Sequence, residues 1–167
     1  MPKVRSLFLF LLVASLAGNP FAEACGDKLM AFGKGLRFQR AFLAARPASI
    51  LIYARQGQAG ASLRDSRFQS ALKQVGHKFL TVENATQLDE ALRSGAYDLV
   101  LADVADAGAV APQALSARGK PLLVPVAYKP TKELLAAVKR QYPVVLKAPG
   151  DPLDHLTSID EAMKRRG

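Results

Sequence analysis

The first candidates for chemistry are polar side chains that follow apolar runs of the sequence. Five residues lie within a few positions of the end of such a run: Arg55, Asp103, Asp106, Tyr128 and Lys147. A carboxylate beside a cation can form a fixed ion pair, which need not add net stability. Cations at such positions can instead hold a carboxylate or a phosphate. Two interpretations stay open: Asp103 pairs with Arg55 or Lys147, or Arg55 and Lys147 bind an acidic small molecule or a partner's carboxylate.

Other reactive residue types are sparse. His77 and His155 are the only histidines, and neither has metal-ligand spacing to a second candidate, so a surface or packing role is expected for both. Cys25 is the only cysteine, which excludes an intramolecular disulfide and a multi-cysteine metal site. No Ser-His-Asp arrangement is visible. We therefore expect no metal, no cofactor and no enzymatic activity.

A glycine-rich turn precedes the apolar runs. Gly33, Lys34 and Gly35 stand before a segment that contains Arg37, and glycines at a helix N-terminus favour anions. The turn lacks the GxxxxGK[ST] spacing of a phosphate-binding loop. It is interpreted either as an anion-binding turn or as a plain turn.

Periodicity predicts strands that alternate with helices. Strands are expected at 48–54, 78–82, 97–104, 121–127 and 143–146, and helices at 62–75, 85–93, 131–141 and 151–164. Ser62, Asn84 and Thr131 are the expected N-caps. Pro112 predicts a short or broken helix over 105–117, and Pro125 removes a ladder hydrogen bond from its strand. In the helix over 131–141, Leu134, Leu135 and Val138 are expected to face inward.

This alternation predicts an α/β fold. Right-handed crossovers give a five-stranded, doubly wound parallel sheet between two helical layers, with the expected strand order 2-1-3-4-5. The domain is expected to span residues 48–167, and residues 25–47 form an N-terminal extension. In such sheets the ligand crevice lies beyond the carboxyl ends of the strands, where Arg55, Asp103 and Lys147 fall.

The pattern resembles the receiver domain of bacterial response regulators over residues 48–166. The run Tyr97–Asp103 looks like the third receiver strand, so the resemblance places Asp103 at the phosphoacceptor position. Lys147 falls near the receiver lysine that contacts the phosphoryl group. In the receiver pattern that lysine directly precedes proline, whereas here Ala148 stands between Lys147 and Pro149.

Departures from the receiver pattern affect the expected chemistry. A receiver holds Mg²⁺ with an acidic pair after its first strand, and here those positions are Ala54 and Arg55. Mg²⁺ needs oxygen ligands. The hydroxyl residue expected at the end of the fourth strand is Val126. Because phosphoryl transfer depends on metal and positioned charge, we expect a degenerate receiver in which Asp103 is not phosphorylated.

The first 24 residues predict an export signal. Lys3 and Arg5 precede an apolar run over Leu7–Ala17, and Ala22 and Ala24 suit a signal peptidase. That run is short for a membrane span, which needs about 20 residues. We expect cleavage after Ala24 and a mature periplasmic chain with no transmembrane segment. A retained N-terminal helix is the first alternative. Acylation of Cys25 is the second, although Glu23 departs from the lipoprotein pattern.

Charge adds little about partners. The chain has 23 basic and 14 acidic residues, a net charge of +9, and the charges are scattered rather than striped. This favours a solvated basic surface and no nucleic-acid partner. The expected function is a receiver-like interaction module for another envelope protein. The alternatives are a periplasmic binder of a small anionic ligand and a true phosphorelay receiver that uses Asp103.

Overall fold

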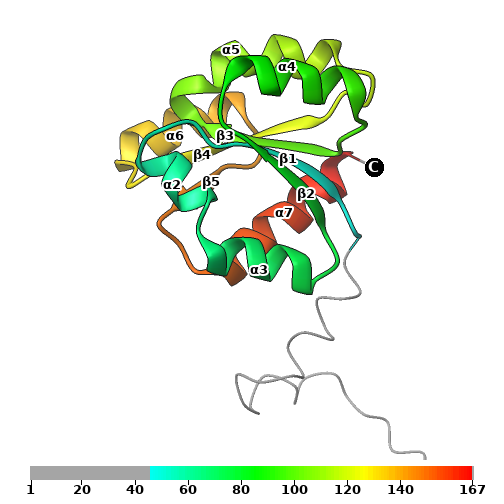
Figure 1. Cartoon of the computed structure of the whole chain (residues 1–167). Helices are drawn as coiled ribbons and strands as arrows, with labels where there is room; N and C mark the ends of the chain where they lie inside the picture. The colour runs from blue at the N-terminus through cyan, green and yellow to red at the C-terminus, as the bar shows by residue number, and fades with distance from the viewer. Residues whose placement is uncertain (1–45, 167) are drawn as a thin grey trace, which may run out of the picture. The chain divides into compact units, whose positions relative to one another are not determined.

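The computed structural model describes residues 46–166. They form one five-stranded parallel sheet in the order β2-β1-β3-β4-β5, which confirms the predicted fold class and strand order (Figure 1). The strands are β1 Ser49–Tyr53, β2 Lys78–Val82, β3 Leu99–Asp103, β4 Leu122–Tyr128 and β5 Leu146–Ala148. The helices are α2 Gln58–Leu63, α3 Ser66–Gln74, α4 Ala85–Ser94, α5 Val104–Ser116, α6 Lys132–Gln141 and α7 Pro152–Arg166.

Helices cover both faces of the sheet, so its central strands are apolar without interruption. In β1, Ile50 and Ile52 point into a core shared with α3 and α7, while Leu51 and Tyr53 point into a core shared with α4 and α5. Figure 1 shows α4 and α5 on one side of the sheet and α3 and α7 on the other. Because all five strands are parallel, their carboxyl ends lie on the same side of the sheet, which we call the carboxyl edge.

The predicted helix over 62–75 is wrong in its start and continuity. The structure has two helices, α2 and α3, and the N-cap of α3 is Asp65, whose Oδ1 accepts the Arg67 N–H at 2.7 Å. Ser62 lies inside α2, where its hydroxyl donates to the Gln58 carbonyl at 3.0 Å. Aspartate is a strong N-cap, and the chain turns at Arg64 and Asp65 to begin a second helix.

The predicted break near Pro112 is also wrong, because α5 is a continuous helix of 13 residues. Pro112 cannot donate to the carbonyl of Gly108, and a proline ring crowds that carbonyl. Gly108 is exposed, and nothing lies within 4 Å of the position where a side chain would begin. The alanine-rich remainder of α5 favours helix strongly enough to continue through the proline.

Pro125 fits inside β4 because its nitrogen points away from a paired neighbour. Leu122 N–H donates to Asp98 on the β3 side, and Lys129 N–H donates to Ala148 on the β5 side. Alternation along the strand directs the Pro125 nitrogen toward β5, yet pairing with β5 begins only at Val126. No ladder bond is therefore lost.

Two further boundaries differ from the prediction. β5 begins at Leu146, although Val144 and Val145 are also buried. In α6 only Val138 is buried, whereas Leu134 is 42% exposed and does not face inward. An apolar run predicts which residues are buried, but it does not predict which of them form ladder hydrogen bonds. This is why the predicted strand over 143–146 begins before β5.

The expected roles of Cys25 and of the turn at Gly33, Lys34, Gly35 and Arg37 fall outside the described residues, as does the expected export signal. Within residues 46–166, no helix combines the length and apolarity that crossing a membrane requires.

Candidate functional site

Arg55 and Asp106 form an ion pair at the carboxyl edge of the sheet. Arg55 Nη1 lies 2.5 Å from Asp106 Oδ1, and the two side chains are 57% and 16% exposed. The hydrogen bond that Arg55 donates to Asp106, and then the charge of Asp106, raise the pKa of the Arg55 guanidinium. The pair joins the segment after β1 to the first turn of α5.

Asp103 caps a helix, whereas the sequence analysis considered an ion pair for it. Its Oδ1 accepts the Ala105 N–H at 3.0 Å, so it is the N-cap of α5. Within the described part of the chain Asp103 forms no ion pair. The predicted pair of Asp103 with Arg55 or Lys147 is therefore wrong. Asp106 lies one helical turn along and reaches Arg55, while a capping carboxylate is held against its own helix.

Lys147 lies in a separate place. It is the middle residue of β5, between buried Leu146 and Ala148, so its side chain points to the opposite face of the sheet from theirs. It lines a hollow of 710 Å³ beside β5, together with Lys139 of α6 and residues of α7, which we call the Lys147 hollow. The residue directly before Pro149 is Ala148, and the position that the resemblance gives to lysine is thus held by a small buried side chain.

Val126 and Tyr128 are the two residues of β4 that the sequence analysis singled out for the site. Val126 is the register partner of Asp103 and is buried in the core, so an apolar side chain stands where the receiver pattern has a hydroxyl. Tyr128 is half-buried at the end of β4 and packs against the same core. The Lys129 ammonium lies 5.4 Å from its ring centroid. Tyr128 does not join Arg55 and Asp106 around one described hollow.

The segment after β1 is tightly held. The side chain of Arg64 donates to the carbonyls of Ala54 and Arg55. Gly60 packs so closely that a Cβ on it would lie 1.8 Å from the Arg55 carbonyl oxygen. The connection between β1 and α2 is short, because α2 begins at Gln58. These contacts fix the backbone from which Arg55 projects.

A second hollow, of 450 Å³, opens beside the Arg55–Asp106 pair between α4 and α5. We call it the Tyr53 hollow, and its polar lining includes Tyr53, Arg55, Glu83, Asp106 and Gln113. Burial raises the pKa of Tyr53, with Arg55 opposing this, so the phenol is protonated near neutral pH. Sequence reasoning missed Glu83 and Gln113. The position of Glu83 directly after β2 was the available signal.

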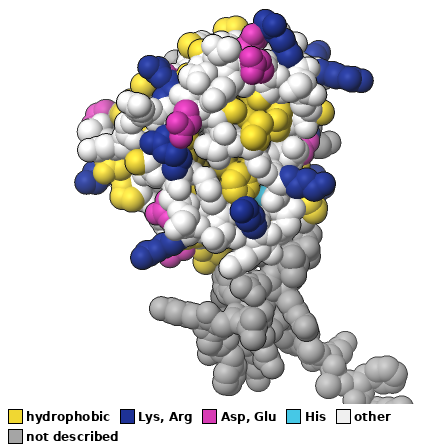
Figure 2. Space-filling model, in the orientation of Figure 1, with side chains coloured by type: hydrophobic (Ala, Val, Ile, Leu, Met, Phe, Trp, Pro, Cys, Tyr) yellow, Lys and Arg dark blue, Asp and Glu magenta, His cyan; other side chains and the backbone are white. Residues whose placement is uncertain are grey.

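The acidic and histidine side chains of residues 46–166 are dispersed. Among residues 46–166, no group of three or more His, Cys, Asp or Glu side chains is close enough to hold one ion. Figure 2 shows basic and acidic side chains interspersed over the visible face rather than gathered in one patch. The carboxyl edge thus carries an ion pair and a helix cap.

Similarity to known proteins comes from structure alone. No protein-family model matches the chain, and no curated protein matches it. A response regulator receiver protein from Sinorhizobium medicae WSM419 superposes with a TM-score of 0.54 at 20% identity, over 73% of this chain and 98% of that one. The described domain has the receiver fold.

Two further receiver domains give the same result. The signal receiver domain of a putative Luxo repressor protein from Vibrio parahaemolyticus matches with a TM-score of 0.54 at 13% identity, over 72% of this chain and 93% of that one. The receiver domain of a modulated diguanylate cyclase from Desulfovibrio desulfuricans G20 matches with a TM-score of 0.54 at 20% identity, over 72% of this chain and 97% of that one. At these identities the likeness establishes the fold, and function must be argued from the site.

Proposed function

We propose that this protein is a receiver-fold module of the cell envelope that works by binding another protein and does not transfer phosphoryl groups. The observation that carries the proposal is the ion pair of Arg55 with Asp106 at the carboxyl edge. Phosphoryl transfer to an aspartate depends on a metal and positioned positive charge around the phosphoryl oxygens. Here Asp106 occupies Nη1 of Arg55, while Asp103 caps a helix.

Two more residues support the loss of phosphoryl transfer. Val126 offers no hydroxyl opposite Asp103. Lys147 lines the Lys147 hollow, and its side chain points away from the buried side chains of Leu146 and Ala148. A phosphoryl group on Asp103 would therefore lack both the hydroxyl contact and the lysine contact of the receiver pattern.

A binding role is supported by exposed apolar side chains on two successive helices. Leu115 of α5 is 70% exposed and Leu134 of α6 is 42% exposed. Large apolar side chains in water often mark interaction surfaces, although single ones are common. We propose that Leu115 and Leu134 belong to the partner-binding surface.

Export is proposed from the sequence of the first 24 residues. Lys3, Arg5 and the apolar run that follows them fit a signal, with cleavage after Ala24. Intact mass of the protein from fractionated native cells tests this. A mass matching residues 25–167 in the soluble periplasmic fraction is the expected result. Uncleaved cytosolic protein would contradict export and make phosphorylation plausible again.

Phosphorylation is tested directly. The full-length protein is incubated with Mg²⁺ and a small acyl-phosphate donor, and its mass is compared with that of Asp103→Asn. We expect no added phosphoryl group in either protein. A phosphoryl group that appears on the wild type and is lost in Asp103→Asn would overturn the proposed function.

Partner binding is tested by crosslinking in envelope extracts. Leu115→Asp with Leu134→Asp is compared with Leu80→Asp, which alters a 45% exposed leucine on edge strand β2. Capture of one partner that is lost in the double variant and kept in the control is the expected result. Equal capture by all three proteins would exclude this surface.

A further inference from the structure

The Tyr53 hollow has the size and lining of a small-molecule site. Its 450 Å³ falls within the range of about 300–1,000 Å³ that is usual for ligand pockets. Leu88 of α4 and Val110 of α5 contribute apolar surface, and both are almost fully buried. The polar groups come from the ends of β1 and β2 and from α5, so three elements converge on one space.

Two polar groups at this hollow have no partner among the described residues. Tyr53 is 6% exposed, and its hydroxyl makes no hydrogen bond within residues 46–166. Gln113 Oε1 is buried and likewise has no hydrogen-bond partner there. Buried polar groups in proteins are nearly always hydrogen-bonded, so the buried Gln113 oxygen calls for an explanation, whereas the Tyr53 hydroxyl is reached by solvent. A ligand that accepts from Tyr53 and donates to Gln113 would satisfy both.

The charged groups of the hollow fit a ligand that carries both a carboxylate and an ammonium group. Arg55 uses Nη1 to bind Asp106, which leaves Nε and Nη2 to donate to a carboxylate. Glu83 is 61% exposed, and its ion pair with Arg64 is long, at 3.9 Å. Its carboxylate can therefore accept from an ammonium group. A ligand with only one charge would use one side of the hollow.

We propose that the Tyr53 hollow binds a free amino acid with an aliphatic side chain. Arg55 and the Tyr53 hydroxyl hold the ligand carboxylate, Glu83 and Gln113 Oε1 hold its ammonium group, and Leu88 and Val110 contact its side chain. This site is independent of the proposed partner surface at Leu115 and Leu134, so failure of one does not decide the other.

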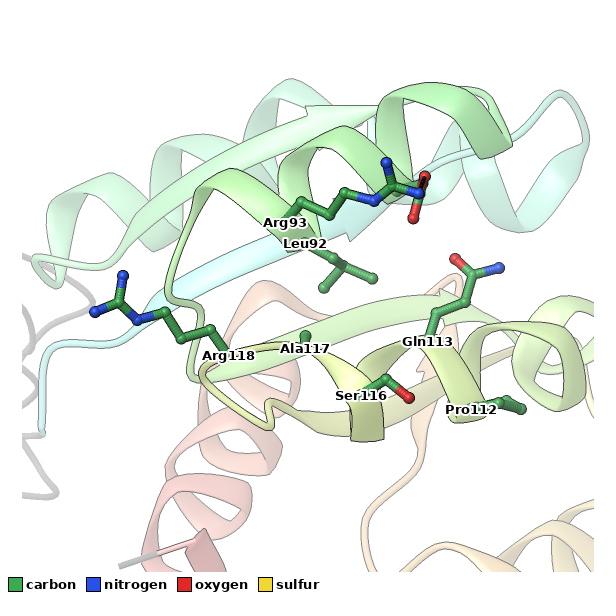
Figure 3. A pocket seen from close by; sticks show the side chains of 8 residues that line it. Leu92, Arg93, Pro112, Gln113, Ser116, Ala117 and Arg118 are labelled. Atoms are coloured by element: carbon green, nitrogen blue, oxygen red, sulfur yellow. Dashed lines mark ion pairs between the residues drawn. The ribbon is translucent and has the colours of Figure 1, made fainter.

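The neighbouring hollow on the same helix pair supplies a matched control. It lies toward the far ends of α4 and α5 and is lined by Arg93, Gln113, Ser116 and Arg118, among others, and we call it the Arg118 hollow. Figure 3 shows Gln113 reaching from α5 toward α4, with Arg118 at the opposite end of the pocket. Arg118→Gln therefore changes charge beside the same groove without touching the Tyr53 hollow.

The experiment is isothermal titration of the full-length protein with leucine and two analogues. One analogue, 4-methylpentanoate, lacks the ammonium group, and the other, 3-methylbutylamine, lacks the carboxylate. We expect leucine to bind the wild type and Arg118→Gln equally. Glu83→Gln should weaken leucine binding about ten- to a hundredfold, the usual range for a hydrogen bond to a charged group. Binding of 4-methylpentanoate should be weak and unaffected by Glu83→Gln.

Two results would overturn the proposal. One is the absence of saturable binding for leucine and for the other aliphatic amino acids. The other is leucine binding that Glu83→Gln and Tyr53→Phe leave unchanged, because the ligand would then lie elsewhere. Amide chemical shifts in the bound state give an independent readout, and the largest changes are expected at residues 53–55, 83–85 and 106–113.

Discussion

Gly60 packs against the backbone of Arg55 and leaves no room there for a side chain. We predict that Gly60→Ala lowers the free energy of unfolding by about 1–3 kcal/mol or more, as overpacking of a tight site does. The cause is the Arg55 carbonyl, 1.8 Å from the new Cβ. Urea unfolding followed by circular dichroism measures the change.

Gly108→Ala is the matched control for that substitution. Nothing lies within 4 Å of a Cβ at Gly108, which is exposed in α5. Alanine is the better helix former, so this variant should be unchanged or more stable by up to about 1 kcal/mol. Equal losses in the two variants would show that close packing at Gly60 is not the cause.

His77 gives the protein a pH dependence that can be isolated. Its Nδ1 accepts the Ala48 N–H at 3.0 Å, and the ring is buried. Burial lowers the pKa of His77 below 6.5, and the opposing charge of Asp160 is the smaller effect. The folded protein therefore binds fewer protons than the unfolded chain as pH falls below about 6.5, and stability is lost over that window.

We predict that His77→Asn removes this part of the pH dependence. The Asn Oδ1 can accept from Ala48 in place of Nδ1, and it does not titrate. Unfolding free energies at neutral pH and at pH values below 6.5 are measured for both proteins. The wild type should lose more stability on acidification than the variant. Identical losses would show that His77 is not responsible.

At the scale of elements, Asp98 ties the amino edge of the sheet to the last helix. Its Oδ2 accepts the Ser49 N–H of β1 at 2.7 Å, and its Oδ1 accepts from Arg166 of α7. Arg166 also donates to the Gly119 carbonyl at 3.0 Å. One carboxylate thus connects the segment before β3 with both β1 and α7.

Substitution should show that Asp98 contributes more than Arg166 to the free energy of unfolding. We expect Asp98→Ala to lower the free energy of unfolding by about 1.5–3 kcal/mol, because the Ser49 N–H also loses a charged acceptor. Arg166→Ala should cost less, since its loss leaves that bond in place. Chemical denaturation of the two variants makes the comparison, and a larger loss for Arg166→Ala would contradict it.

Helix α6 is the element expected to open most easily. Only Val138 of its ten residues is buried, whereas Leu99–Ala102 of β3 are all fully buried. Segments with little buried apolar surface open at low free-energy cost. Hydrogen exchange with mass spectrometry should therefore find faster exchange in α6 than in β3. Protection of α6 equal to that of β3 would refute this.

At the scale of the whole molecule, residues 46–166 contain an extensive buried core. All three buried clusters consist of residues between Ala48 and Met163. We predict that a fragment beginning at Arg46 folds with one cooperative unfolding transition, as single domains of this size usually do. Calorimetry and circular dichroism should report the same midpoint. Failure of the fragment to fold would show that preceding residues complete the core.

Alternation of apolar runs and amphipathic segments was enough to predict the sheet, its strand order and the helical layers. Those features depend on which side chains avoid water and on the handedness of crossovers, both of which are local or general. The capping roles of Asn84 and Thr131 were predictable for the same reason and are confirmed. The N-cap role of Asp65 was harder to predict, because several residues near Leu63, including Ser62, are also of types that cap helices.

The sequence by itself determined the fold class and the expectation that the receiver's acidic pair is replaced by Ala54 and Arg55. Only the tertiary structure decided that Arg55 pairs with Asp106, and that Lys147 lines a different hollow from Arg55. Ion pairs depend on distances between elements, and no sequence spacing sets those distances. In a strand, neighbouring side chains point to opposite faces, so Lys147 points away from the core that contains Leu146 and Ala148.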